Sequence, residues 1–226
     1  ELCRLLPETV LDEYVLIMFL PMSMQVVNDI SAKCRTRAGL VITTLIKRCS
    51  LDFAIQCQGY SLRWLGIQDK NTDKGDSEII NKLWNIQQRS LIRTGAQVAT
   101  LIAQGRPDLF KRGTTIIRIL SFIRLALQQF VLRENNEENN NETNANSTTE
   151  LEGEGDGGGV EIWAFLYYFL TLFERLYLEL PTLVDRGMTV GLSTADKENK
   201  DSDSPSPPLM LELIQEAILF PHAWVR

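Results

Sequence analysis

The stretch FLPMSMQVVNDISAKCRTRAGLVITTLIKRCS, residues 19–50 of this 226-residue chain, decides the fold. Apolar side chains recur in it at intervals of three and four residues, which is the period of an α-helix. The period breaks near Asp29, and Ser31 follows as a suitable N-cap residue. We therefore expect two antiparallel helices joined by a tight turn, with Pro21 kinking or interrupting the first helix.

The residues around this turn have the spacing of a HEAT repeat, a unit of about 40 residues that stacks into an α-solenoid. Arg35 follows Asp29 by six residues, and Ala38 follows Arg35 by three. We expect Asp29 to accept hydrogen bonds at the turn and Arg35 to pair with an Asp of a neighbouring repeat. Ala38 would let the paired helices approach closely. The predicted fold class is all-α, a HEAT-repeat α-solenoid fragment of antiparallel helix pairs.

Helical periodicity recurs along the chain, whereas the alternation typical of strands is weak. The predicted helices cover residues 9–28 around Pro21, 31–48, 51–65, 79–103, 107–132, 160–180 and 209–220. The predicted buried face of the first helix consists of Val10, Tyr14, Ile17 and Met18. That of the second consists of Cys34, Ala38, Val41, Ile42 and Leu45.

Charge divides the chain into unequal parts. Residues 1–133, the predicted HEAT-type repeats, carry 18 Lys/Arg and 11 Asp/Glu, a net of +7, and residues 134–226 carry 5 and 18, a net of −13. The segment 134–159 is rich in Asn, Gly and acidic residues, so we expect a disordered insertion. HEAT-type helices should resume over 160–226, interrupted by a second disordered loop at about 187–207.

Sites for catalysis, cofactors and metals are not evident in the sequence. The four cysteines, Cys3, Cys34, Cys49 and Cys57, lack CxxC spacing, and we interpret them as buried free thiols of a reducing compartment. His222 is the sole histidine, and neither GxGxxG nor GxxxxGK[ST] occurs. We expect no enzymatic activity, no cofactor and no metal. The longest near-apolar run, Ile162–Phe173, has 12 residues, too few to span a bilayer, so we expect no membrane partner. We also expect no small-molecule substrate.

Basic residues give candidate contacts with RNA or another polyanion. Arg89 and Arg93 are four residues apart and share a helix face, while Lys111 and Arg112 are adjacent. Each of these four side chains belongs either to a solvated face or to a polyanion contact. For Arg35 a structural role in the repeat is favoured.

The aromatic segment around residues 162–180 invites two interpretations. Its apolar positions form a wide stripe, from Trp163 and Leu166 to Phe169, Leu170 and Phe173, and Tyr167, Tyr168 and Leu172 widen it further. Such a helix is typically buried between neighbours, and the alternative is a docking surface for a partner protein. Trp64 and Trp84 likewise favour core or inter-repeat packing over stacking on bases.

Two short blocks resemble a known family. The first consists of Phe19, Leu20, Pro21, Val27, Asn28, Asp29, Ser31, Cys34 and Arg35. The second is Pro221–Arg226, with Phe220 where a His is often found. Both resemble runs near the C-terminus of the family of U3 small nucleolar RNA-associated protein 20, also called the down-regulated in metastasis family. Arg226 follows Phe220 by six residues, as Arg35 follows Asp29, so we expect Trp224 to pack at a repeat turn, Arg226 to open a further helix and the chain to stop within a repeat.

The resemblance implies a function. Members of this family are long nucleolar HEAT-repeat proteins of the small-subunit processome, the U3-containing particle that processes pre-18S ribosomal RNA. The implied role is a non-enzymatic scaffold for 40S ribosome assembly, with other processome proteins, pre-rRNA and U3 small nucleolar RNA in the same particle. Two alternatives stay open: another HEAT-repeat scaffold, such as a nuclear transport receptor or a phosphatase or kinase scaffold, and a nucleic-acid-binding module.

Overall fold

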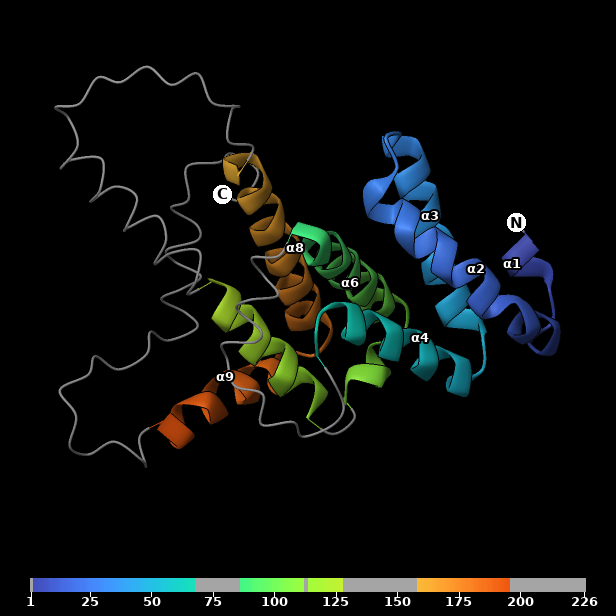
Figure 1. Ribbon diagram of the computed structural model, residues 1–226. Helices are drawn as coiled ribbons and strands as arrows, with labels where there is room; N and C mark the ends of the chain where they lie inside the picture. Colours follow the sequence, from blue (N-terminus) through green and yellow to red (C-terminus); the bar gives the residue numbers. More distant parts are fainter. Residues whose placement is uncertain (1, 68–85, 112–113, 128–157, 196–226) are drawn as a thin grey trace, which may run out of the picture.

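A computed structural model describes residues 2–67, 86–111, 114–127 and 158–195 (Figure 1). These residues form helices and include no strand, which confirms the all-α prediction for the described part. The helices are α1 (Leu2–Leu5), α2 (Glu8–Asn28), α3 (Ala32–Arg48), α4 (Leu51–Trp64), α6 (Ile86–Gly105), the 3-10 helix η1 (Pro107–Lys111), an unlabelled helix over 115–127, α8 (Gly158–Glu179) and α9 (Pro181–Ala195).

Helices α2 and α3 form an antiparallel hairpin, as predicted. Ser31 is the N-cap of α3, where its hydroxyl accepts a hydrogen bond from the Cys34 N–H. At the other end of the pair the Ser50 N–H donates to Asp12 Oδ1 over 2.9 Å, which ties the end of α3 to the start of α2. Ala38 is buried. Helix α2 continues through Pro21, so the interruption that was one of the two predicted effects of this proline does not occur.

Helices α4 and α6 form a second pair, and glycine sets how closely they approach. A Cβ built on Gly95 would lie 2.7 Å from the Leu65 backbone nitrogen and 2.9 Å from the Ser61 carbonyl oxygen. Neither contact can be relieved by turning a side chain, because both involve backbone atoms. Gly95 therefore allows α6 to lie directly against the last turn of α4.

The second helices of these pairs, α3 and α6, lie side by side and run in the same direction. Near their starts the Ser90 hydroxyl donates to Asn28 Oδ1 over 3.2 Å. Farther along, Gly39 faces Leu101, and Gly105 faces Ile46. The two hairpins thus stack with corresponding helices adjacent, and α8 packs against the other side of α6 (Figure 1).

The last described helices add a third layer. Phe122 of the 115–127 helix meets Phe169 of α8 edge to face, with ring centroids 5.6 Å apart. Helix α9 starts directly after α8 at Pro181, and its Gly187 lies against Leu120. The core is therefore continuous from α2 to α9.

The buried face of α2 differs from the prediction. Leu11, Val15 and Phe19 are fully buried, whereas the predicted core residues Val10 and Ile17 are exposed. Tyr14 is also exposed and Met18 is half-buried. The reason is that α2 is apolar on two opposite faces, so its periodicity does not distinguish the inner face from the outer one.

Three predicted boundaries were also wrong. The helix expected over 107–132 is divided, because Pro107 begins a short 3-10 helix and the next helix starts at 115. The loop expected from about 187 starts later, since α9 continues to Ala195. The insertion 134–159 lies outside the described residues except for its last two, which begin α8.

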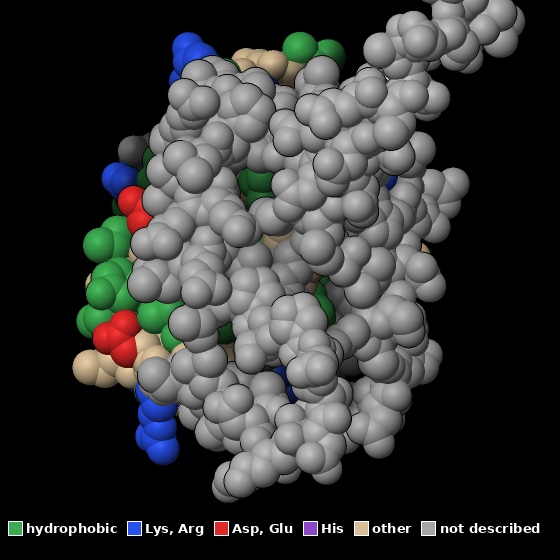
Figure 2. Space-filling view, turned by 90° about the vertical axis from the view of Figure 1, so that its left-hand side faces the viewer, with side chains coloured by type: hydrophobic (Ala, Val, Ile, Leu, Met, Phe, Trp, Pro, Cys, Tyr) green, Lys and Arg blue, Asp and Glu red, His purple; other side chains and the backbone are tan. Residues whose placement is uncertain are grey.

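Helix α2 is also long and apolar enough to cross a membrane, judged by length and composition only. One of its faces packs into the protein core, and Asp12 near its start binds the Ser50 backbone. Figure 2 shows hydrophobic side chains at the surface along the left edge of that view, interspersed with Asp, Glu, Lys and Arg side chains.

The close approach at Gly95 yields a test of the packing. We expect Gly95→Ala to lower the free energy of unfolding by about 1–3 kcal/mol, because the added methyl group must push α4 and α6 apart. The matched control is Gly59→Ala on α4, where a Cβ meets nothing within 4 Å. That control should gain roughly 0.5–1 kcal/mol from helix propensity. Urea unfolding followed by circular dichroism measures both, and equal stabilities would contradict the packing described.

Candidate functional site

Three arginines bind the carbonyl groups that helices leave without partners at their C-terminal ends. Arg35 Nη1 donates to the carbonyl oxygens of Asp29 (2.7 Å) and Ile30 (3.1 Å), at the end of α2. Arg48 donates to the carbonyl oxygens of Cys3 and Leu6, at the end of α1. A cation at this end of a helix also interacts favourably with the helix dipole.

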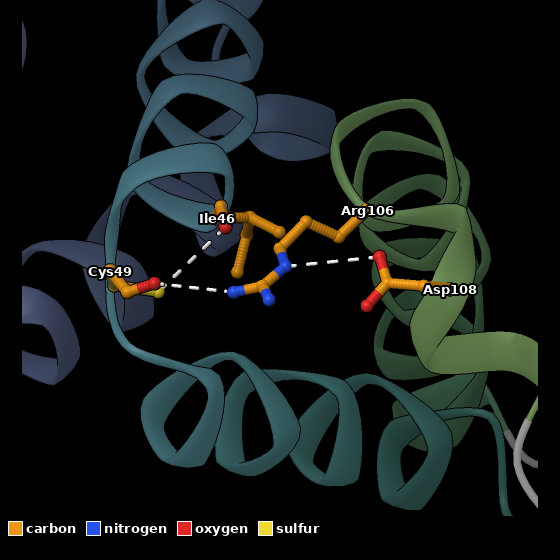
Figure 3. Close-up of polar contacts among 4 residues, drawn as sticks. All are labelled: Ile46, Cys49, Arg106 and Asp108. Carbon is orange, nitrogen blue, oxygen red and sulfur yellow. Dashed lines mark hydrogen bonds and ion pairs between the residues drawn. The ribbon is translucent and has the colours of Figure 1, made fainter.

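The third of these arginines, Arg106, joins the two stacked hairpins (Figure 3). Its guanidinium donates to the Cys49 carbonyl oxygen over 3.2 Å, at the C-cap of α3, and its Nε lies 3.8 Å from Asp108 Oδ1. Arg106 itself directly follows α6. Arg106, at the end of the α4–α6 hairpin, thereby binds the end of the α2–α3 hairpin. Asp108 orients the Arg106 side chain.

The predicted role of Asp29 as an acceptor at the turn is confirmed, whereas the predicted pairing of Arg35 with an Asp of a neighbouring repeat is not found in the described residues. Asp29 Oδ1 accepts a hydrogen bond from the Ser31 N–H over 2.8 Å. Arg35 donates to backbone carbonyls of the same turn, and within the described residues no ion pair joins it to an Asp of a neighbouring hairpin. Trp224 and Arg226 lie outside the described residues.

The three candidate RNA contacts that lie within the described residues do not form one patch. Arg89 and Arg93 lie near the start of α6 and are half-buried, whereas Lys111 is exposed on η1, beyond the other end of that helix. The part of α6 between Arg93 and Gly105 is about 18 Å long at the usual helical rise. Arg112 lies outside the described residues.

Lys111 borders a pocket of about 300 Å³ between η1, the 115–127 helix and α9. Its lining is Phe110, Lys111, Ile116, Ile117, Leu183, Arg186 and Gly187. The wall is therefore mainly apolar, and the two cations come from elements that are far apart in sequence.

Arg93 belongs to a group that the sequence did not place together. It consists of Arg35 on α3, Arg93 on α6, and Tyr167 and Tyr168 on α8, and we call it the cation–aromatic cluster. Burial raises the pKa of the Tyr168 phenol above its ordinary value, while the positive charges of Arg93 and Arg35 act in the opposite direction. The charges of Arg93 and Arg35 thus act electrostatically on this phenol. The adjacent Tyr167 contacts Tyr168 edge to face, with ring centroids 5.4 Å apart.

Only a faint signal for this cluster is present in the sequence. Tyr167 and Tyr168 were predicted to widen a buried stripe, and Leu166, Phe169 and Leu172 of that stripe are indeed buried. Tyr167 keeps 38% of its surface exposed. Two adjacent hydroxyl-bearing rings in an otherwise apolar helix were the available hint. Trp64 packs in the core as predicted, stacked on Phe19 with ring centroids 6.2 Å apart, and Trp84 lies outside the described residues.

The cysteines are free thiols in different environments. Cys49 and Cys57 are buried as predicted, but Cys34 is exposed and Cys3 is half-buried, so the prediction was wrong for Cys34. Burial raises the pKa of Cys49 to about 11 and that of Cys57 to about 12. Within the described residues no three His, Cys, Asp or Glu side chains gather as a metal site would require.

Comparison with known proteins gave no match: neither the family models, nor the curated proteins, nor the solved structures matched this chain.

The turn geometry predicts how α2 is held. We expect Arg35→Met to lower the free energy of unfolding by about 1–3 kcal/mol, because two carbonyls lose a charged donor while the apolar stem remains. Arg37→Met on the same helix is the control, since Arg37 is exposed and its loss should cost less than about 0.5 kcal/mol. Denaturant unfolding of both variants measures the difference, and an equal loss would count against the assigned role.

The buried thiols predict a decline of stability at high pH. The raised pKa of Cys57 means that between pH 9 and 12 the unfolded chain loses a proton that the folded chain keeps. The free energy of unfolding should therefore fall as pH rises, by about 1.4 kcal/mol per pH unit for this group. Cys57→Ala should flatten that slope between pH 10 and 11, whereas Cys34→Ala should leave it unchanged. If both variants keep the parental slope in urea titrations, the prediction fails.

Proposed function

We propose that this chain is a non-enzymatic scaffold of the small-subunit processome, within a large nucleolar HEAT-repeat protein that supports pre-18S rRNA processing and 40S assembly. The observation that carries the proposal is the resemblance of residues 19–35 and 221–226 to the down-regulated in metastasis family. The first of these blocks forms the end of α2, the turn at Asp29 and the start of α3.

The packing of the described helices supports a solenoid of HEAT type. Antiparallel pairs stack with α3 beside α6 and α6 beside α8, so each layer contacts chiefly its neighbours. This is the organisation that lets repeat proteins present long continuous surfaces. A scaffold that bridges several partners uses such surfaces for binding and positioning, without making or breaking bonds.

The positive charge of helices α3 and α6 supports polyanionic partners. Helices α3 and α6 contain seven Lys/Arg and no Asp/Glu between them, five on α3 and two on α6. A surface of this sign attracts the phosphate backbone of RNA at long range. Pre-rRNA and U3 small nucleolar RNA are therefore the proposed nucleic-acid neighbours, and other processome proteins are the proposed protein neighbours.

Affinity purification of the full-length protein from cells that produce it, followed by RNA sequencing and mass spectrometry, tests the proposal. We expect U3 and pre-18S RNA to be enriched over an untagged control, together with processome proteins, and the tagged protein to concentrate in the nucleolus. Recovery of transport factors or of phosphatase or kinase subunits without either RNA would contradict the proposal and favour the alternative scaffold.

A further inference from the structure

We propose that the outer face of α2 is a self-association surface, on which a second copy of this chain packs its own α2 in the antiparallel direction. The outer face consists of five exposed residues, Val10, Tyr14, Ile17, Pro21 and Met24. Helix α2 lies at one end of the described stack, and α3, α4 and α6 pack against its other sides (Figure 1). This surface is independent of the proposed function, because it requires neither RNA nor a processome protein.

The first argument is the spacing along the outer face. Its successive members are four, three, four and three residues apart, so they form one line along the helix. This is the spacing with which two helices pack lengthwise against each other. The line is about 21 Å long at the usual helical rise, and Ile17 at its centre is 68% exposed. Such a continuous apolar surface is typical of a contact with a partner.

The second argument is a symmetry about Ile17, which identifies the partner as a second copy. Exposed large apolar residues lie 3, 7 and 12 residues before Ile17, and 3, 7 and 13 residues after it. They are Tyr14, Val10 and Leu5 on one side, and Leu20, Met24 and Ile30 on the other. When two copies of α2 lie antiparallel with Ile17 beside Ile17, each of these residues meets an apolar residue at the same level. A two-fold interface requires this self-complementarity, whereas a contact with an unrelated helix does not.

The third argument is charge, which favours the antiparallel direction. The acidic residues of α2 all lie in its first six residues, and residues 14–28 contain no charged side chain. A parallel pair would place Glu8 beside Glu8 and Glu13 beside Glu13. In an antiparallel pair each acidic part lies over the uncharged part of the other copy. The start of α3, which packs beside that part, carries the exposed cations Lys33 and Arg37.

A lipid surface is a poorer match for the outer face. Helices that lie in the membrane interface carry Lys and Arg along their polar side. The 21 residues of α2 include Glu8, Asp12 and Glu13 and no Lys or Arg. A second protein surface is therefore favoured over anionic lipid.

Sedimentation velocity of the 226-residue chain, at concentrations from about 1 to about 200 µM, tests the proposal. We expect a monomer at the low end and a dimer at the high end, because a line of about 21 Å gives an interface at the small end of the specific range. Ile17→Glu should weaken dimerisation about 100-fold or more, since two carboxylates would meet at the centre without partners. Leu178→Glu on α8 is the matched control, because Leu178 is 61% exposed and lies away from α2.

A mixture of two variants tests whether Ile17 meets Ile17. Ile17→Lys alone should fail to dimerise for the same reason as Ile17→Glu. Mixed with Ile17→Glu it should form a heterodimer, at least about tenfold tighter than either variant with itself, because opposite charges then meet at the centre. An interface between different surfaces would not give this recovery.

Oxidative cross-linking tests the direction. The background is Cys3→Ser with Cys34→Ser, which removes the two cysteines that are not buried. Val10→Cys combined with Met24→Cys should form a covalent dimer with copper phenanthroline, whereas Val10→Cys alone should not. The two positions are about 21 Å apart within one chain, too far for a disulfide. Cross-linking of Val10→Cys alone would indicate a parallel pair and overturn the proposed arrangement.

Three further results would overturn the proposal. They are a chain that stays monomeric at about 200 µM, an equal loss in Ile17→Glu and Leu178→Glu, and no recovery in the mixture of Ile17→Glu with Ile17→Lys. Circular dichroism establishes that each variant is folded. Binding of the parent chain to phosphatidylserine vesicles that is lost in Ile17→Glu would also overturn it and assign the outer face to lipid.

Discussion

The structure depends on how the ends of its helices are satisfied. Each helix leaves carbonyl oxygens without partners at its C-terminal end, and a stack of hairpins brings those ends into the packed region. Arg35, Arg48 and Arg106 supply donors there, and each reaches a backbone oxygen. Since every residue has a carbonyl, this connection places no demand on the acceptor's side chain. It requires only that the arginine lie where its guanidinium can reach that carbonyl oxygen.

This constraint explains which features could be predicted from the sequence. Arg35 and Ser31 act on atoms a few residues away, so their spacing was sufficient to predict the turn. Arg48 and Arg106 act on carbonyls 45 and 57 residues away, and no local pattern shows such contacts. The cation–aromatic cluster is of the same kind, because α3, α6 and α8 come together only when the hairpins stack. The apolar pattern of α2 was only partly informative: it predicts a helix, but it does not predict which face of the helix is buried.

The candidate site and the scaffold share their elements. Arg35 holds the turn of the first hairpin, so the position of its charge is set by the same contacts that form the repeat. Gly95 acts on the same helix as Arg93 by allowing α6 to rest on α4. Position and charge are thus supplied by rigid helices, which hold a binding group more accurately than loops do.

The two apolar faces of α2 have a consequence for how the chain reaches one structure. Rotating α2 by half a turn would bury Val10, Ile17 and Met24 in place of Leu11, Val15 and Phe19, with little change in the hydrophobic term. Burial alone therefore leaves two near-degenerate orientations. The hydrogen bond from Ser50 to Asp12 and the stacking of Phe19 on Trp64 exist in only one of them. A few directional contacts, rather than the bulk of the core, give this helix a single energy minimum.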